Sequence, residues 1–227
     1  MRRDVRDPIL ASVACALLLA PLVAAAYGVG AGRRLDASVL NRFAAHDGSV
    51  GHTLAAAVVA LGEPVALLGM LALLVTVGLL AGRTRETIAA VVLVLGANVT
   101  TQLLKQLLAH PRLQEAVVGS GHPWPDSFPS GHTTAAASIA VAALLVVPPR
   151  LRAATALAGA AFTVAMGIAV LVLQWHFPSD VLGALLVVGS WAFAVIAALR
   201  LVRPRGPDSP PRGKSETASG QFAVSLR

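Results

Sequence analysis

Residues 129–147 of the chain read PSGHTTAAASIAVAALLVV, and here a polar loop passes into a long apolar run. Pro129 ends the loop, and Ser130 stands where the N-cap of a helix is expected. Gly131 lets a ligand approach the backbone closely, and His132 adds a side chain that can donate a proton near neutral pH. The first free backbone N–H groups of such a helix form an anion site, although an ordinary helix start gives the same pattern.

Two further polar clusters also lie at the ends of apolar runs. Lys105 and Arg112 precede the stretch with six residues between them, and His176 and Asp180 follow it with three between them. The lysine and arginine either snorkel to the lipid headgroups or together hold phosphate oxygens. Asp180 either orients His176 as a nucleophile or caps the next helix beside an interfacial histidine. A metal site is the less favoured alternative, because no cysteine is nearby.

The composition identifies the chain as an integral membrane protein. Of its 227 residues 56% are hydrophobic and 13% are charged, and the apolar runs approach the length of about 20 residues that crosses a bilayer. The net charge of +7 is divided among short clusters between these runs, which is a topology signal and not a nucleic-acid-binding face. Cys15 is the single cysteine, so an intrachain disulfide does not hold the fold together.

The hydropathy pattern predicts an all-α fold with six membrane-spanning helices. We expect the first run to be an uncleaved span and not a signal peptide, because its apolar core exceeds roughly 7–15 residues. The mixed segment at 33–61 is expected to lie in the membrane interface. Residues 1–202 then form one domain, and residues 203–227 form a disordered cytoplasmic tail. The expected spans are residues 8–31, 63–81, 86–108, 132–147, 153–173 and 181–202.

Glu63 stands directly before Pro64, where the second expected span begins. A carboxylate at this place is either a buried proton carrier or a charge at a helix start that the helix dipole and water stabilise. We favour the second interpretation from the sequence.

The distribution of arginine and lysine predicts that both termini are cytoplasmic. In that orientation thirteen of the 18 Lys and Arg residues lie on the inner side, in agreement with the positive-inside rule. All three polar clusters then reach the same, extracytoplasmic membrane surface. We therefore expect a multi-pass protein of a bacterial cell membrane. The basic residues left on the outer side are Arg33, Arg34, Arg42, Lys105 and Arg112.

The three clusters, Lys-x6-Arg, Pro-Ser-Gly-His and His-x3-Asp in this order, resemble the type-2 phosphatidic acid phosphatase superfamily. These are membrane lipid phosphatases related to the vanadium-dependent haloperoxidases. The resemblance implies that His176 attacks phosphorus, that Asp180 orients it, and that His132 protonates the leaving alkoxide. It also implies that no metal or other cofactor takes part, and that the phosphate oxygens are held by Lys105, Arg112, Ser130 and the Gly131 amide.

The chain departs from the family pattern at two places. Leu113 follows Arg112 where the family usually has proline. More seriously, Val170 stands where the family usually has an arginine that binds phosphate. His110 and His122 in the preceding loop are the candidates for a replacement cation.

The predicted function is that of a lipid phosphate phosphatase that acts on a phosphomonoester or diphosphate through a phosphohistidine. One alternative is a lipid phosphotransferase, in which an alcohol takes the place of water. Another is a catalytically weak binder or carrier of lipid phosphates, which the replacement of the arginine by Val170 keeps open. The pattern specifies no particular lipid and no oligomeric state. The expected partners are the lipid substrate and membrane lipids, and no nucleic acid.

Overall fold

The computed structural model describes residues 3–43, 48–108 and 127–202, and every regular element in these ranges is helical. The predicted all-α fold class is therefore confirmed. Arg112, His110, His122 and the tail from Arg203 lie outside the described residues. The elements are α1 (Arg3–Val23) with a π-helical turn (Ala24–Gly28), α2 (Gly30–Phe43), α3 (Val50–Ala60), α4 (Pro64–Leu80), α5 (Thr84–Leu107), α6 (Gly131–Val146), a 3-10 turn (Pro149–Leu151), α7 (Arg152–Val172) and α8 (Pro178–Leu201).

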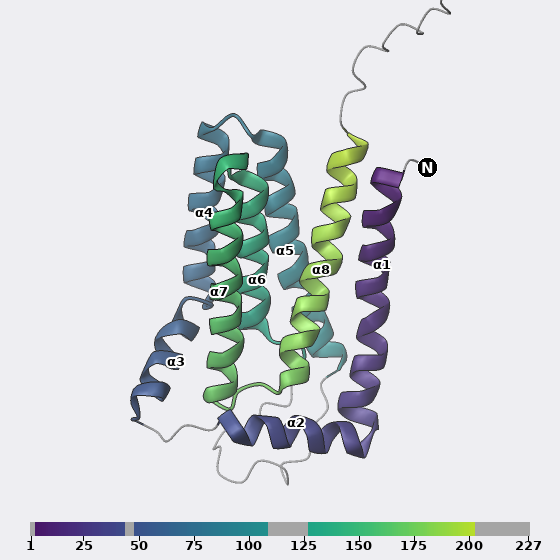
Figure 1. Cartoon of the computed structure of the whole chain (residues 1–227), viewed down its shortest axis with the longest axis vertical. Helices are drawn as coiled ribbons and strands as arrows, with labels where there is room; N and C mark the ends of the chain where they lie inside the picture. Colours follow the sequence, from purple (N-terminus) through teal and green to yellow (C-terminus); the bar gives the residue numbers. More distant parts are fainter. Residues whose placement is uncertain (1–2, 44–47, 109–126, 203–227) are drawn as a thin grey trace, which may run out of the picture.

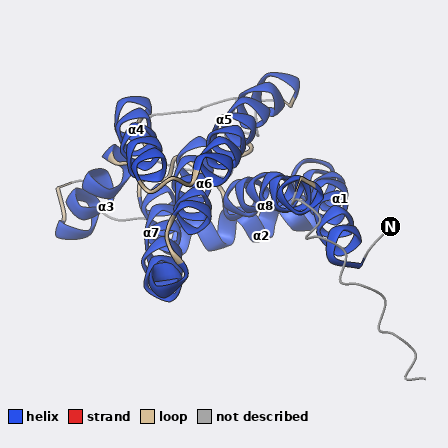
Figure 2. Cartoon of the chain, turned by 90° about the horizontal axis from the view of Figure 1, so that it is seen from above, coloured by secondary structure: helices blue, strands red, loops and turns tan. Residues whose placement is uncertain are grey.

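Helices α4 to α8 run side by side and alternate in direction along the chain, with α6 at the centre (Figures 1 and 2). α6 contacts α4, α5, α7 and α8. Its composition explains this position, because Ala135, Ala136 and Ala142 are at most 2% exposed and present only a methyl group to their neighbours. Small side chains let helix backbones approach one another closely in a membrane.

α1 packs along α8 at the side of the bundle (Figure 1). The two helices are joined by a hydrogen bond from the Ser12 hydroxyl to the Ser190 carbonyl oxygen at 2.8 Å. They also approach closely at Gly189, where an added Cβ would lie 3.1 Å from the sulfur of Cys15. Small residues therefore let α1 and α8 approach closely at these points, while Leu19 of α1 packs on the cluster that contains Val187 and Val188 of α8.

Four helices are long and apolar enough to cross a membrane: α1 with its π turn, α5, α7 with the preceding 3-10 turn, and α8. The pair α3 and α4 passes the same test as one broken span, bent by 53°, which raises the number to five. α6 has 16 residues and is about 24 Å long, against about 30 Å for the hydrocarbon core. These helices make the chain an integral membrane protein, while the count of six spans stays a prediction.

The segment at 33–61, expected to lie in the interface, divides into two helices with different surroundings. α2 lies across one end of the bundle (Figure 1). α3 packs against α7, and its residues Ala55 and Val59 are buried in one cluster with Met166 and Val170. α3 thus contributes to the packed core. The expectation of an interfacial segment did not include this burial, because the composition was considered over residues 33–61 as a whole.

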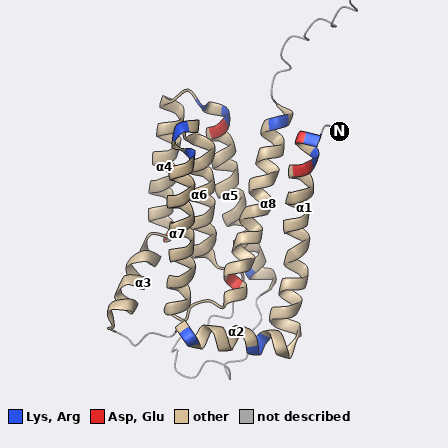
Figure 3. Ribbon diagram, in the orientation of Figure 1, with Lys and Arg blue, Asp and Glu red and all other residues tan. Residues whose placement is uncertain are grey.

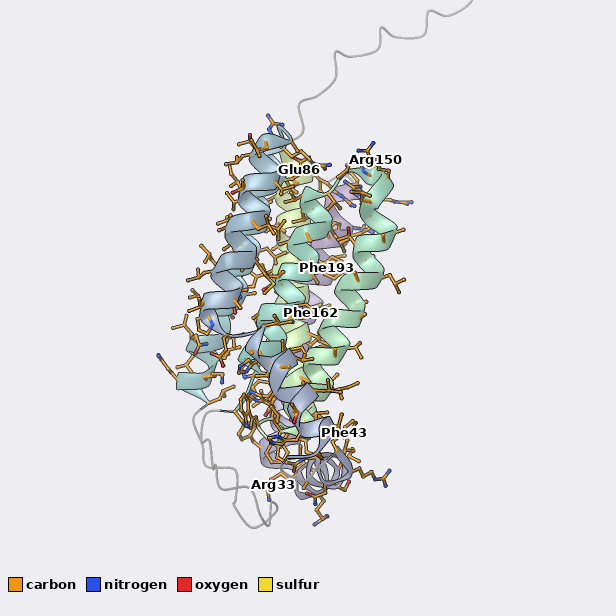
Figure 4. The ribbon with its side chains drawn as sticks, turned by 90° about the vertical axis from the view of Figure 1, so that its left-hand side faces the viewer. Arg33, Phe43, Glu86, Arg150, Phe162 and Phe193 are labelled. Atoms are coloured by element: carbon orange, nitrogen blue, oxygen red, sulfur yellow. The ribbon has the colours of Figure 1, made fainter. Side chains whose placement is uncertain are left out.

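Among the described residues, charged side chains gather at the two ends of the helices, and few lie in the middle of the bundle (Figure 3). Glu86 and Arg150 lie at one end, and Arg33 and Phe43 lie at the other (Figure 4). α2 lies across this second end, where α5 ends and α6 and α8 begin (Figure 1). The predicted site residues on these three helices therefore meet at one end of the bundle.

Candidate active site

The start of α6 is fixed to the start of α8. Ser130 is the N-cap of α6, as predicted, and its side-chain oxygen accepts a hydrogen bond from the Thr133 N–H at 3.3 Å. The Ser130 N–H in turn donates to the carbonyl oxygen of Asp180 at 3.0 Å. Phe128 fills the space above Gly183, where a Cβ would lie 2.5 Å from its ring. These contacts hold the N-terminal amides of α6 beside the first turn of α8.

His176 and Asp180 form a buried pair in the turn between α7 and α8. His176 is 7% exposed and Asp180 is fully buried. The Nδ1 atom of His176 lies 3.4 Å from Asp180 Oδ2, and the same oxygen accepts the Phe177 backbone N–H at 2.9 Å. The contact with Asp180 therefore occupies Nδ1 and leaves Nε2 as the nitrogen available to a substrate.

The turn that carries His176 has a defined geometry, because α7 ends in a Schellman motif. Gln174 has a φ of 59°, in the left-handed region. The Trp175 N–H donates to the Val170 carbonyl oxygen, and the Gln174 N–H donates to that of Leu171, both at 3.0 Å. This closure reverses the chain sharply and directs His176 toward α6.

His132 lies next to His176, with 6.5 Å between their ring centroids. Its ring also lies 5.6 Å from that of Trp175, measured between centroids. Its Nε2 atom is 3.4 Å from Oε1 of Glu63, the residue before α4. The two histidines are separated by 43 intervening residues in the sequence and lie side by side in the structure.

Lys105 reaches the same place from the last turn of α5. A Cβ built on Gly131 would lie 4.0 Å from Lys105 Cε and 3.9 Å from Gln102 Nε2. The absence of a side chain at Gly131 therefore keeps the space between the α6 backbone and the lysine stem open. Of the predicted phosphate-binding residues, the structure brings Lys105, Ser130 and Gly131 together.

Val170 occupies a closed apolar site. Its side chain is fully buried and packs in one cluster with Ala136 of α6, Met166 of α7 and Val59 of α3. The position at which the family motif usually carries a phosphate-binding arginine is therefore filled by hydrocarbon, with α3 completing the enclosure.

Two acidic residues also lie near these groups, and the sequence analysis did not single out Asp36 and did not pair Glu63 with His132. Glu63 does precede a helix, as interpreted, but its side chain makes no cap hydrogen bond and instead contacts His132. Asp36 of α2 accepts hydrogen bonds from the Ser179 N–H at 3.1 Å and the Ser179 hydroxyl at 2.6 Å. The available signal was that the expected topology places both acids at the same membrane surface as the motifs.

The arrangement suits a phosphate group. It combines the amides at a helix N-terminus, an ammonium group and two imidazoles in one place, and such donors bind and stabilise an anion. Among the described residues, no group of three or more His, Cys, Asp or Glu side chains is placed to hold a metal ion.

Comparison with known proteins gives two results that bear on this site. The sequence model of the PAP2 superfamily matches residues 86–203 and so covers α5, α6, α7 and α8. The fold is shared with a crystal structure described as the first transmembrane PAP2 type phosphatidylglycerolphosphate phosphatase from Bacillus subtilis, with a TM-score of 0.70 and 20% sequence identity. That match covers 86% of this chain and 98% of the other. Comparison with curated protein sequences gives no match.

The family match spans more than half of the 227 residues and includes every described residue of the three motifs. The shared fold extends the likeness to most of the chain. The resemblance inferred from the motifs is therefore confirmed: this integral membrane protein belongs to the PAP2 superfamily, a family of lipid phosphatases.

Proposed function

We propose that the protein hydrolyses a lipid phosphomonoester or diphosphate at the extracytoplasmic membrane surface through a phosphohistidine on His176. The observation that carries the proposal is the pair formed by His176 Nδ1 and Asp180 Oδ2 at 3.4 Å, which lies beside His132 at the start of α6. A carboxylate bound to one imidazole nitrogen fixes the tautomer and leaves the other nitrogen free to attack.

Binding of the phosphate begins the proposed reaction. The Gly131 amide, the Ser130 side chain and Lys105 hold its oxygens, and Arg112 adds a planar pair of donors. These groups are preorganised, since Ser130 is tied to both Thr133 and Asp180. They act on charge that spreads over the equatorial oxygens in the transition state.

Transfer then occurs in two steps. His176 Nε2 attacks phosphorus, the bond from phosphorus to the lipid oxygen breaks, and the leaving oxygen takes its electron pair together with a proton from His132. In the second step a water oxygen attacks phosphorus and gives a proton to His132. The phosphorus–nitrogen bond breaks, its electron pair returns to His176, and inorganic phosphate departs. General acid–base catalysis of this kind contributes about 10²–10⁴-fold.

The donor set supports a reaction that proceeds without a metal ion. Cationic side chains and backbone amides perform the charge stabilisation that a metal performs in other phosphoryl-transfer sites. For this reason we expect activity to survive a chelator and to be inhibited by vanadate, which adopts the trigonal-bipyramidal geometry of phosphoryl transfer.

The proposed membrane arrangement has six spans, with α1, α4, α5, α6, α7 and α8 crossing and both termini cytoplasmic. α6 is shorter than the hydrocarbon core, but it is surrounded by other helices and does not face lipid along its whole length. α2, with three basic residues, would lie along the outer surface beside the site.

A product assay with purified protein tests the function. Lipid phosphates and diphosphates are supplied with water as the only acceptor, in the presence of chelator. We expect free phosphate to be released. A parallel assay contains an added alcohol: transfer to this alcohol without release of phosphate in water alone would instead identify a phosphotransferase, and binding without turnover in both assays would identify a carrier. Either result contradicts the proposal, as does a loss of activity in chelator that an added metal restores.

A further inference from the structure

The turn between α3 and α4 reaches directly onto the ring of His132. Gly62 in this turn approaches the ring so closely that a Cβ there would lie 3.0 Å from His132 Cδ2. The next residue, Glu63, places Oε1 3.4 Å from His132 Nε2. One short turn thus covers the ring edge formed by Cδ2 and Nε2.

The opposite edge of the same ring carries Nδ1 and faces away from the turn. This follows from the ring itself, in which Cδ2 is bonded to Nε2 and lies across from Nδ1. The orientation is the reverse of that in the other pair, where Asp180 contacts His176 at Nδ1. The site therefore contains two carboxylate–imidazole pairs, one that leaves Nε2 available and one that leaves Nδ1 available.

Glu63 is not needed as a helix cap. It stands at the N-cap position of α4, but its side chain accepts no hydrogen bond from the first turn, and Pro64 at the start of the helix has no N–H to offer. Its carboxylate is about half exposed and contacts His132, whose side chain is 21% exposed. The side chain of Glu63 therefore contacts His132 and does not cap α4 by a hydrogen bond.

We propose that Glu63 is a positioning residue for His132, an inference that rests on the proposed phosphatase function. Its carboxylate accepts the Nε2–H of the imidazole in both steps of the reaction. In the first step Nδ1–H gives its proton to the leaving lipid oxygen, while Nε2–H stays bound to Glu63. In the second step the bare Nδ1 takes a proton from the attacking water. The proton on Nε2 does not move, and the tautomer is correct for both steps.

The groups that face His132 from the surrounding elements make this contact important. His176 lies on one side, and Lys105 is near enough to interact electrostatically. Both disfavour a positive charge on His132 whenever they are protonated, whereas the carboxylate of Glu63 favours it. Burial of the ring and these two groups oppose the imidazolium, and the Glu63 carboxylate offsets part of that effect.

The test uses two classes of phosphate ester, because proton donation matters only when the leaving oxygen is a poor leaving group. A short-chain alkyl phosphate leaves as an alkoxide and needs the proton, whereas p-nitrophenyl phosphate leaves as a stable phenolate. For Glu63→Gln we expect kcat/KM, which reports the steps up to release of the leaving group, to fall about tenfold or more on the alkyl ester and by less than about twofold on the aryl ester. The second step is common to both esters, so kcat is not used for this comparison. Glu63→Asp should recover part of the loss.

Two further variants separate positioning from a general effect on the fold. Glu86→Gln, at the opposite end of the bundle and paired there with Arg83 at 3.6 Å, is the matched control and should leave both rates unchanged. In a double-mutant cycle, Glu63→Gln should have little further effect once His132→Ala has removed the ring, because the two residues act as a unit.

Equal losses of kcat/KM on both esters, no loss on either, or an additive effect in the His132→Ala background would overturn the inference. Such a result leaves the phosphatase proposal intact as long as the unaltered protein releases phosphate. An unaltered protein that hydrolyses neither ester nor any lipid phosphate contradicts the proposed function instead, so that the two failures are distinguishable.

Discussion

At the scale of single residues, Val170 is the position where this chain departs most from its family's pattern. The side chain is fully buried against Ala136, Met166 and Val59, so no vacant place exists for a guanidinium group. α3 supplies part of the hydrocarbon around it. In the proposed site the cation of the family pattern is therefore absent from this position, and Lys105 lies beside Gly131.

We predict that Val170→Arg lowers both stability and turnover. An uncompensated buried charge destabilises a protein by about 3–5 kcal/mol, and displacement of Ala136 disturbs α6 one turn after His132. Thermal unfolding in detergent and hydrolysis of a small phosphate ester provide the two measurements. Val170→Met adds a long side chain without charge and should do less damage. A higher turnover for Val170→Arg with unchanged unfolding would show that the arginine reaches the phosphate.

Members of the site could be predicted where they belong to a motif that is contiguous in the sequence. Ser130, His132, His176 and Asp180 were selected from local patterns, and the structure brings them together. Glu63 was not selected as a partner, because it meets His132 across 69 positions of the chain. No local periodicity records such a contact, and a charge before a helix has an adequate explanation without it.

At the scale of elements, α2 is attached to the turn that carries His176 at two points. Asp36 accepts the N–H and hydroxyl of Ser179, and the Gln174 side-chain amide donates to the Leu40 carbonyl oxygen at 3.0 Å. Asp36 also lies at the N-terminal end of α8, where a negative charge is favoured by the helix dipole. α2 thus acts as a clamp on both sides of His176.

We predict that Asp36→Ala lowers kcat about tenfold, because hydrogen bonds to a charged group contribute about 1.5–3 kcal/mol and hold the turn in place. Steady-state kinetics measures the loss, and hydrogen exchange at residues 174–180 measures the loosening. Ser38→Ala is the control on the same helix, since its hydroxyl bonds only to the Leu35 carbonyl within α2. Unchanged exchange and activity in Asp36→Ala would show that the clamp is not needed.

The long helices could be predicted from hydropathy, and the expected range 86–108 differs from α5 by two residues at its start. α3 could not. It is only 11 residues long, and it was averaged with the polar residues of α2 into one mixed segment. Its burial depends on packing against α7, which is a tertiary contact and leaves no period in the sequence.

At the scale of the whole molecule, the proposed function requires that the end of the bundle carrying α2 faces the outside of the cell. The positive-inside rule supports this orientation, because the opposite end, where α4 joins α5 and α6 joins α7, carries Arg83, Arg85, Arg150 and Arg152. A lipid phosphate would then reach the site from the outer leaflet.

We predict that Val50→Cys reacts with a membrane-impermeant thiol reagent in intact cells, in a Cys15→Ser background. Val50 begins α3, on the side of the site, and is 77% exposed. Arg85→Cys, in the first turn of α5 at the other end, should react only after lysis. The reverse pattern would place the site on the cytoplasmic side and refute the proposed orientation.

The most direct test of the central claim is to trap the intermediate. The protein is mixed with a lipid phosphate, quenched within one turnover under alkaline conditions that preserve phosphohistidine, and digested for mass spectrometry. The account predicts phosphate on His176, absent from His176→Ala, with a variant of His132 slowing both its formation and its decay. Turnover without a phosphorylated His176, or with phosphate on another residue, would contradict the account.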